Sequence, residues 1–132
     1  TAALPAFLSG LNILVCLLPL TDETRDILCG NTLRQLPVGA ALINAGRGQH
    51  LVEDDLLQLL NSGHLSYAVL DVFRQEPLPA EHPFWQHPAI HITPHIAAVT
   101  RHDSAGQQLA ANLQRFLAGA AMTGEVDKQK GY

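Results

Sequence analysis

An arginine, two carboxylates and a histidine each follow an apolar stretch of this sequence, and side chains of these types can do chemistry together. Arg47 stands between Gly46 and Gly48, directly after the apolar run AALIN at residues 40–44. Its guanidinium offers a fork of hydrogen-bond donors that suits a carboxylate. The alternative is a solvated arginine in a tight turn, since most arginines lie at protein surfaces.

A histidine and two acidic residues could complete such a site. His95 follows Thr93 and Pro94, and the proline restrains the backbone just before the imidazole ring. Glu76 is a candidate partner for His95, because a nearby carboxylate favours the charged imidazolium and so prepares a general acid. Either residue could instead be an ordinary polar surface group. Asp71 either binds a ligand amide or caps the loop behind it.

Hydrophobic patterns predict the elements that carry these side chains. Apolar runs predict buried strands at residues 11–18, 40–44, 65–72 and 89–93, and we expect the first to be covered on both faces. Helical signals lie at residues 4–8, near Asp22, after a cap at Asn31 or Thr32, at 53–63, and from His102 or Asp103 to Leu117. Residues 74–88 contain four prolines and predict an ordered loop. Strands that alternate with helices predict an α/β fold with a parallel sheet.

Parallel strands end at one edge of their sheet, which is where ligands bind in open α/β folds. An arginine, a carboxylate and an imidazole at that edge would form an anion clamp with an acid and base pair. We therefore expect one edge to gather the segment from Pro19 to Thr21 with Arg47, Asp71, Glu76 and His95.

The composition narrows the classes of protein to consider. The 132 residues are enough for one compact domain, and 47% hydrophobic against 15% charged residues argues against disorder. The net charge is −4 and the eight Lys and Arg are not clustered, so we expect no nucleic-acid partner. The longest apolar run, residues 13–18, is too short to cross a bilayer, and we expect no membrane association. Cys16 and Cys29 have no metal or disulfide spacing and favour buried, reduced thiols in the cytoplasm.

Two metal-dependent alternatives are disfavoured. His87, His91 and His95 recur at every fourth position, but prolines preclude a helix there, and in a strand each step would span more than about 10 Å. We therefore expect no metal site. Asp71 alone would also fit an aspartate phosphoacceptor, yet the paired acidic residues that hold a magnesium ion are not evident.

Four ordered motifs and the tail together resemble a known family. The motifs are LLPLTDETR at residues 17–25, INAGRG at 43–48, VLDVFRQEPLP at 69–79 and ITPH at 92–95 with IAAVT behind it, and the tail is EVDKQKGY at 125–132. They resemble the D-isomer-specific 2-hydroxyacid dehydrogenases, most closely their glyoxylate and hydroxypyruvate reductase branch. The resemblance implies a Rossmann-like parallel sheet, NADPH or NADH as cofactor with NADPH favoured, a small 2-oxo acid as substrate, and a homodimer.

The resemblance also assigns roles. It implies that Arg47 binds the substrate carboxylate, that His95 donates the proton, and that Glu76 is its partner. Asp71 would meet the nicotinamide amide, and Pro19 with Thr24 would border the adenosine side of the cofactor. Further cofactor contacts are implied at Ala45, Gly46 and Ala97.

One part of the family pattern is absent. The glycine-rich phosphate loop G-x-G-x-x-G, which places a helix amino end against the pyrophosphate, does not occur in the sequence. We therefore expect the carboxyl-terminal part of such an enzyme, inactive alone. Residues 1–100 would complete the dinucleotide-binding domain, and residues 101–132 would return to the substrate domain. The alternative is a noncatalytic α/β module that binds a small anion or a nucleotide.

Overall fold

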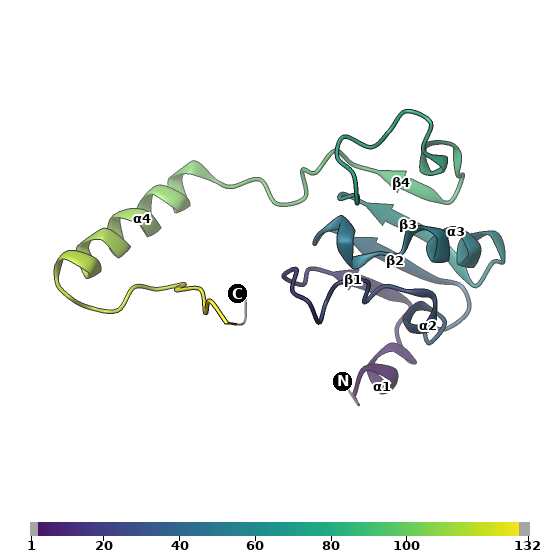
Figure 1. The fold of residues 1–132 in the computed structure, drawn as a ribbon, viewed down its shortest axis with the longest axis horizontal. Coiled ribbons are helices and arrows are strands. Elements are labelled where there is room, and N and C mark those ends of the chain that lie inside the picture. Colours follow the sequence, from purple (N-terminus) through teal and green to yellow (C-terminus); the bar gives the residue numbers. More distant parts are fainter. Residues whose placement is uncertain (1–2, 130–132) are drawn as a thin grey trace. The chain divides into compact units, whose positions relative to one another are not determined.

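The computed structural model describes residues 3–129 and forms two compact units, Thr1–Ala97 and Ala98–Tyr132. The first unit is a four-stranded sheet with helices packed on it (Figure 1). The strands are β1 (Ile13–Cys16), β2 (Ala40–Asn44), β3 (Leu65–Leu70) and β4 (Ile90–Ile92).

All neighbouring strands are parallel, and the sheet order is β1-β2-β3-β4, which runs from bottom to top in Figure 1. Each crossover carries the chain back to the start of the next strand, so all four strands end at the same edge. The predicted α/β class with a Rossmann-like parallel sheet is confirmed.

Short helices connect the strands of the first unit, and their bounds follow local signals only in part. Helix α3 begins with three acidic residues, which suit the positive end of the helix dipole, and its C-terminal Gly63 adopts a left-handed φ of 75°. It packs against β3 and α2. The helices are α1 (Leu4–Leu8), α2 (Gly30–Leu33), η1 (Gly48–His50), α3 (Glu53–Asn61) and η2 (Pro83–Gln86).

The hydrophobic core lies between the helices and one face of the sheet. Leu42 of β2, Leu56 of α3 and Leu70 of β3 are fully buried within it. Burial of such leucine side chains stabilises the fold by about 1.5–3 kcal/mol each. The same core therefore fixes the position at which each strand ends and each candidate side chain emerges.

The expectation that the first strand is covered on both faces is wrong. The strand β1 spans only Ile13–Cys16 and alternates between exposed and buried residues: Leu14 and Cys16 are buried, whereas Ile13 and Val15 are 56% and 49% exposed. Helices of the first unit cover one face of β1, so the apolar side chains of the other face stay exposed.

Two helix predictions between β1 and β2 are also corrected. No helix starts near Asp22, because residues 22–26 form turns and Asp26 takes a left-handed φ of 57°. The helix α2 begins at Gly30, ahead of the predicted caps Asn31 and Thr32. Its first N–H is instead capped by Asp55 Oδ2 of α3 at 2.6 Å.

The remaining differences are small. Residues 74–88 form a loop as predicted, but it includes the 3-10 turn η2. Both cysteines are free; Cys16 is buried, whereas Cys29 is only half-buried, so the prediction of buried thiols holds for Cys16 alone. Burial raises the pKa of the Cys16 thiol.

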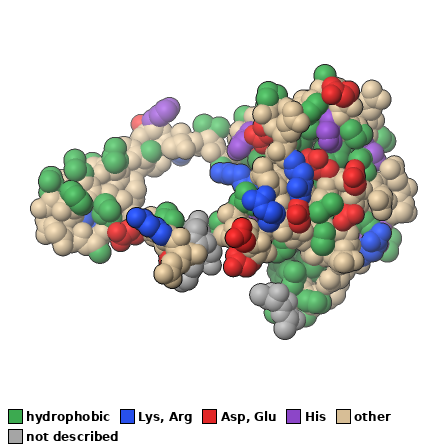
Figure 2. Space-filling view, in the orientation of Figure 1, with side chains coloured by type: hydrophobic (Ala, Val, Ile, Leu, Met, Phe, Trp, Pro, Cys, Tyr) green, Lys and Arg blue, Asp and Glu red, His purple; other side chains and the backbone are tan. Residues whose placement is uncertain are grey.

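The second unit consists of helix α4 (His102–Leu117) and a following segment of turns. Gly119, two residues after the helix, has a left-handed φ of 68° and closes it, as the sequence predicts. Its apolar side chains lie on the surface, where Figure 2 shows them in green: Leu109, Leu113, Phe116 and Leu117 are each more than half exposed. Within the described residues, no helix has the length and apolar character that a membrane span requires.

Candidate active site

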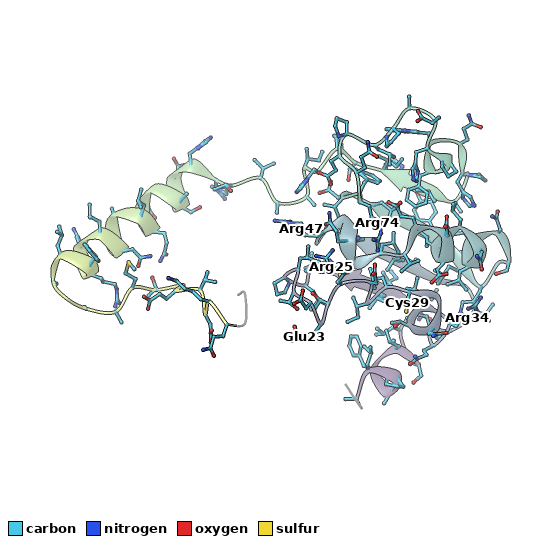
Figure 3. The ribbon with its side chains drawn as sticks, in the orientation of Figure 1. Glu23, Arg25, Cys29, Arg34, Arg47 and Arg74 are labelled. Atoms are coloured by element: carbon cyan, nitrogen blue, oxygen red, sulfur yellow. The ribbon has the colours of Figure 1, made fainter. Side chains whose placement is uncertain are left out.

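Arg47 leaves the carboxyl end of β2 in a turn that buried polar side chains hold in place. Asn44 is fully buried; its Oδ1 accepts a hydrogen bond from Gly46 N at 3.2 Å and its Nδ2 donates to Arg47 O at 3.1 Å. The Arg47 N–H donates to His50 Nδ1 at 3.1 Å. The backbone is therefore fixed on both sides of Arg47, while its guanidinium stays exposed at this edge of the sheet (Figure 3).

Gly48 brings this turn against the segment that carries Glu76. A Cβ added at Gly48 would collide with the backbone of Phe73 and Arg74. Only glycine allows this close approach between the chain after β2 and the chain after β3. The Arg47 turn and the Glu76 loop consequently form one packed edge.

His95 and Glu76 form a hydrogen-bonded pair at the same edge. His95 Nδ1 lies 2.9 Å from Glu76 Oε2, and Glu76 Oε1 accepts from Phe73 N at 2.9 Å. With Nδ1–H donating to the carboxylate, Nε2 of His95 has no hydrogen-bond partner in the described part of the chain. The His95 side chain is 49% exposed, so a ligand can reach this nitrogen.

The electrostatics keep the Glu76 carboxylate charged. Its hydrogen bond with His95 and that from Phe73 N hold the pKa of Glu76 below its usual value, although burial raises it slightly, and the charges of His95 and Arg47 add to the lowering. Arg47 is thus close enough for its charge to act on Glu76. The structure brings together the three predicted catalytic residues, Arg47, Glu76 and His95, in one electrostatic cluster.

Asp71 organises the chain around His95. Its carboxylate is 3% exposed and accepts three hydrogen bonds, from Thr93 Oγ1 at 2.5 Å and from the backbone N–H groups of Ile96 and Ala97 at 2.9 Å each. Burial raises the pKa of Asp71, but these hydrogen bonds outweigh burial and hold it below its usual value. The loop cap that the sequence left open as an alternative is formed here, and the contact with a nicotinamide amide stays a prediction.

The Asp71 cap holds His95 in an uncommon backbone conformation. His95 has a left-handed φ of 55°, which is rare for a residue with a side chain. Such strain is maintained only where surrounding contacts impose it. Here the hydrogen bonds from Ile96 N and Ala97 N to Asp71 impose this conformation. The orientation of the His95 side chain is therefore set by the turn that carries it.

The predicted cofactor contacts lie where the strands end. Thr24 Oγ1 donates to Pro19 O at 2.7 Å, which folds the loop after β1, and Ala45 follows β2 directly. Ala97 is adjacent to the Asp71 carboxylate. Contact between these residues and a cofactor stays a prediction.

A recess opens beside the His95–Glu76 pair. It has a volume of about 490 Å³ and an apolar lining with the pair at its charged end. The apolar residues that line it are Phe73, Pro77, Leu78, Trp85, Ile92 and Pro94. Among residues 3–129, no group of three or more His, Cys, Asp or Glu is arranged to hold a metal ion.

Sequence reasoning missed the residues that support this site. These residues are Asn44, which bonds within its own turn, and His50 and Thr93, which reach Pro19 and Asp71 across the fold; none of them was singled out for a role. A signal existed for Asn44, since a polar residue within an apolar strand is buried only when it is hydrogen-bonded. No local pattern indicates the ring contacts of His50.

Comparison with known proteins links the whole chain to one group of enzymes. The family model described as D-isomer specific 2-hydroxyacid dehydrogenase, NAD binding domain, matches residues 1–97. Glyoxylate/hydroxypyruvate reductase A of Serratia proteamaculans is 54% identical over 96% of this chain, and that of Yersinia enterocolitica is 50% identical over 98%. The chain spans 41% of the length of each of these curated relatives.

Solved structures agree with the sequence matches. A D-isomer specific 2-hydroxyacid dehydrogenase from Xanthobacter autotrophicus, in complex with NADPH and MES, superposes with a TM-score of 0.95 at 42% identity, covering 99% of this chain and 54% of that one. An NADPH-dependent glyoxylate/hydroxypyruvate reductase from Sinorhizobium meliloti, in complex with NADP and sulfate, gives 0.94 at 40% identity, covering 100% and 43%.

Proposed function

The chain belongs to the D-isomer specific 2-hydroxyacid dehydrogenase family, and from this premise we propose that it is the catalytic part of a reductase. The full-length protein that contains it would reduce glyoxylate, hydroxypyruvate or a similar small 2-oxo acid to the 2-hydroxy acid with NADPH or NADH. The names of the curated relatives support this substrate class, and the cofactors in the solved relatives favour NADPH.

The observation that carries the proposal is the hydrogen bond between His95 Nδ1 and Glu76 Oε2 at 2.9 Å, within reach of the Arg47 charge. A carboxylate that holds Nδ1–H leaves Nε2 as the nitrogen that exchanges a proton with a ligand. An imidazole ring whose orientation is fixed can act as a general acid when it is protonated. The His95–Glu76 pair thus provides a general acid near Arg47, and Arg47 is a cation that can bind an anion.

Each residue then has a distinct task. The Arg47 guanidinium pairs with the carboxylate of the oxo acid and polarises its carbonyl. His95 donates the Nε2 proton to the oxygen that becomes the hydroxyl group. Glu76 retains its charge because its pKa is lowered, and this charge stabilises the imidazolium until the proton leaves.

The residues at the strand ends fit a nicotinamide dinucleotide. Pro19, Thr24 and Ala45 would hold it beside β1 and β2, while Asp71 and Ala97 would lie near its nicotinamide end. A bound nicotinamide supplies the hydride for the ketone carbon. Gly46 permits the close packing this edge requires, because a Cβ there would lie 3.2 Å from Leu18 O and 3.0 Å from the His50 ring.

A noncatalytic module is the second candidate function. The exposed Arg47 guanidinium favours it, since a fork of hydrogen-bond donors at the strand ends can hold a small anion without any hydride transfer. Such a module would bind a small anion at Arg47 without turning it over. A homodimer and a cytoplasmic location are also part of the proposal.

The test is the variant His95→Gln in the full-length protein, with His91→Gln as the matched control. His91 lies four residues earlier on β4 and is exposed. Loss of a general acid predicts that kcat for NADPH-dependent glyoxylate reduction falls by about 10²–10⁴-fold in His95→Gln and is unchanged in His91→Gln. Near wild-type turnover by His95→Gln would remove the acid assignment. A wild-type protein that binds glyoxylate but does not reduce it would favour the noncatalytic module.

A further inference from the structure

We propose that His50 is a positioning residue that ties the substrate-binding arginine to the cofactor-side loop. The proposal rests on the proposed function and assigns a role to a residue outside the predicted site. His50 closes the 3-10 turn η1 after Arg47 and is fully buried, so it cannot touch a substrate itself.

Both ring nitrogens of His50 are engaged. Nδ1 accepts a hydrogen bond from Arg47 N at 3.1 Å, so Nδ1 carries no proton. Nε2 therefore bears the ring hydrogen and donates it to Pro19 O at 3.3 Å. One ring bridges the turn after β2 and the loop after β1, two segments that lie 31 residues apart in the chain.

The Pro19 carbonyl shapes the cofactor-side loop. It accepts a second hydrogen bond from Thr24 Oγ1 at 2.7 Å, and Thr24 Oγ1 in turn accepts from Thr21 N at 2.8 Å. His50 thus donates to the carbonyl at which the 19–24 loop closes on itself. A change at His50 Nε2 would reach the loop that is expected to border the adenosine side.

The space for the ring is provided by glycine. A Cβ on Gly46 would lie 3.0 Å from His50 Nδ1 and 3.2 Å from Leu18 O. The bare Gly46 backbone lets the imidazole approach both the Arg47 turn and the end of β1. The backbone of His50 is fixed as well, because Leu28 N donates to His50 O at 2.9 Å and His50 N donates to Arg47 O at 3.1 Å.

The two contacts have separable consequences. The Nδ1 contact orients the Arg47 backbone, and with it the guanidinium that binds the oxo acid. The Nε2 contact sets the Pro19 carbonyl on the cofactor side. His50 therefore supports both binding events through different nitrogens, which a residue that only fills the core would not do.

Conservative variants of the full-length protein can separate these contacts. The Oδ1 atom of His50→Asn can replace Nδ1 as the acceptor, whereas the amide nitrogen of His50→Gln can replace Nε2 as the donor. We expect His50→Asn to raise the Kd for NADPH by about 2- to 12-fold with little change in KM for glyoxylate, and His50→Gln to do the reverse, as the loss of one hydrogen bond predicts. His50→Leu should impair both constants.

The same substitutions at the exposed His91 serve as controls and should leave both constants unchanged. The positioning role would be overturned if His50→Asn and His50→Gln changed the Kd for NADPH and the KM for glyoxylate equally. It would also be overturned if these variants altered thermal stability and left both constants unchanged. If His50→Leu does not fold, the Asn and Gln pair still decides the question. A wild-type protein without reductase activity refutes the proposed function, and fluorescence titration of NADPH then still tests the Nε2 contact.

Discussion

Within residues 3–129 the Arg47 guanidinium forms no ion pair, and its Nη1 donates a hydrogen bond to the neighbouring Gly46 O at 2.7 Å. An exposed guanidinium at the strand ends is therefore available to an anion. Arg34 offers a useful contrast, because it directly follows α2 as its C-cap and Figure 3 shows it away from this edge. The difference between the two arginines is one of location, which makes them a matched pair for mutagenesis.

In the full-length protein, Arg47→Ala should raise KM for the oxo acid and lower kcat, because the same guanidinium meets the ground-state carboxylate and the developing oxyanion. Loss of charged hydrogen bonds predicts that kcat/KM falls by about 10- to 100-fold. Arg34→Ala should leave steady-state kinetics unchanged. If NADPH affinity collapsed in Arg47→Ala while KM for the acid stayed constant, Arg47 would be a cofactor residue instead.

Asp71 should stabilise the fold in a pH-dependent way. Its pKa in the folded protein is below the ordinary 3.8, so its contribution is complete above about that pH and is lost as the pH falls through the lower folded value. We expect Asp71→Asn to reduce the free energy of unfolding by about 1–3 kcal/mol at pH 7. Urea unfolding at several pH values should show this difference shrinking below pH 3.8. A difference that grew with acidification would contradict the assignment.

The candidate residues could be singled out in the sequence because each follows an apolar run or lies within a family motif. What holds them could not be predicted in the same way. Asn44 bonds within its own turn, but His50 reaches Pro19 and Asp71 reaches Thr93, across 31 and 22 residues. Such pairs form only after the strands have been placed side by side.

The turn after β2 is the element on which the site depends most closely. Gly48→Ala should destabilise the full-length protein by about 1–3 kcal/mol or more, since the added Cβ would collide with the backbone of Phe73 and Arg74. Gly106→Ala, in the middle of α4, should have the opposite sign and stabilise by about 0.5–1 kcal/mol, because no atom lies within 4 Å of the added Cβ.

Thermal unfolding of both glycine variants provides the measurement. A Gly48→Ala protein as stable as wild type would show that the Arg47 turn does not pack against the Glu76 loop as described. Activity should fall together with stability in Gly48→Ala, because the same displacement moves Arg47.

Elements with strong local signals were predicted well, and those set by distant contacts were not. The acidic first turn of α3 and Gly63 mark that helix in the sequence itself. Residues 22–26 fail to form the predicted helix because Asp26 N and Leu28 N donate to Gln49 O and His50 O, at 2.9 Å each. Likewise α2 starts early because Asp55, 25 residues away, caps it.

In the molecule as a whole, β1 is a strand with one edge unpaired among the described residues and with exposed apolar side chains. In the described chain it pairs only with β2, so its other edge has no strand partner. The apolar side chains of Ile13, Val15 and the following Leu17 are also 56%, 49% and 70% exposed. A recess of about 370 Å³, lined by residues of α1 and β1 among others, also opens there. The chain spans 41% of its curated relatives, and this surface is where further strands of a longer protein would add.

The 132 residues expressed by themselves are therefore predicted to be inactive with NADPH and not to persist as a simple monomer. An exposed apolar edge strand is a template for pairing with another chain, and the apolar face of α4 offers a second surface for exchange between copies. Light scattering should show dimers or larger species. Val15→Lys should increase the monomer fraction, because a charge on an edge strand opposes pairing, whereas Val38→Lys, at another exposed valine, should not. A monodisperse wild-type monomer that oxidises NADPH in the presence of glyoxylate would refute both halves of the prediction, since it would mean that this sheet needs no further strand and binds the cofactor without a glycine-rich loop.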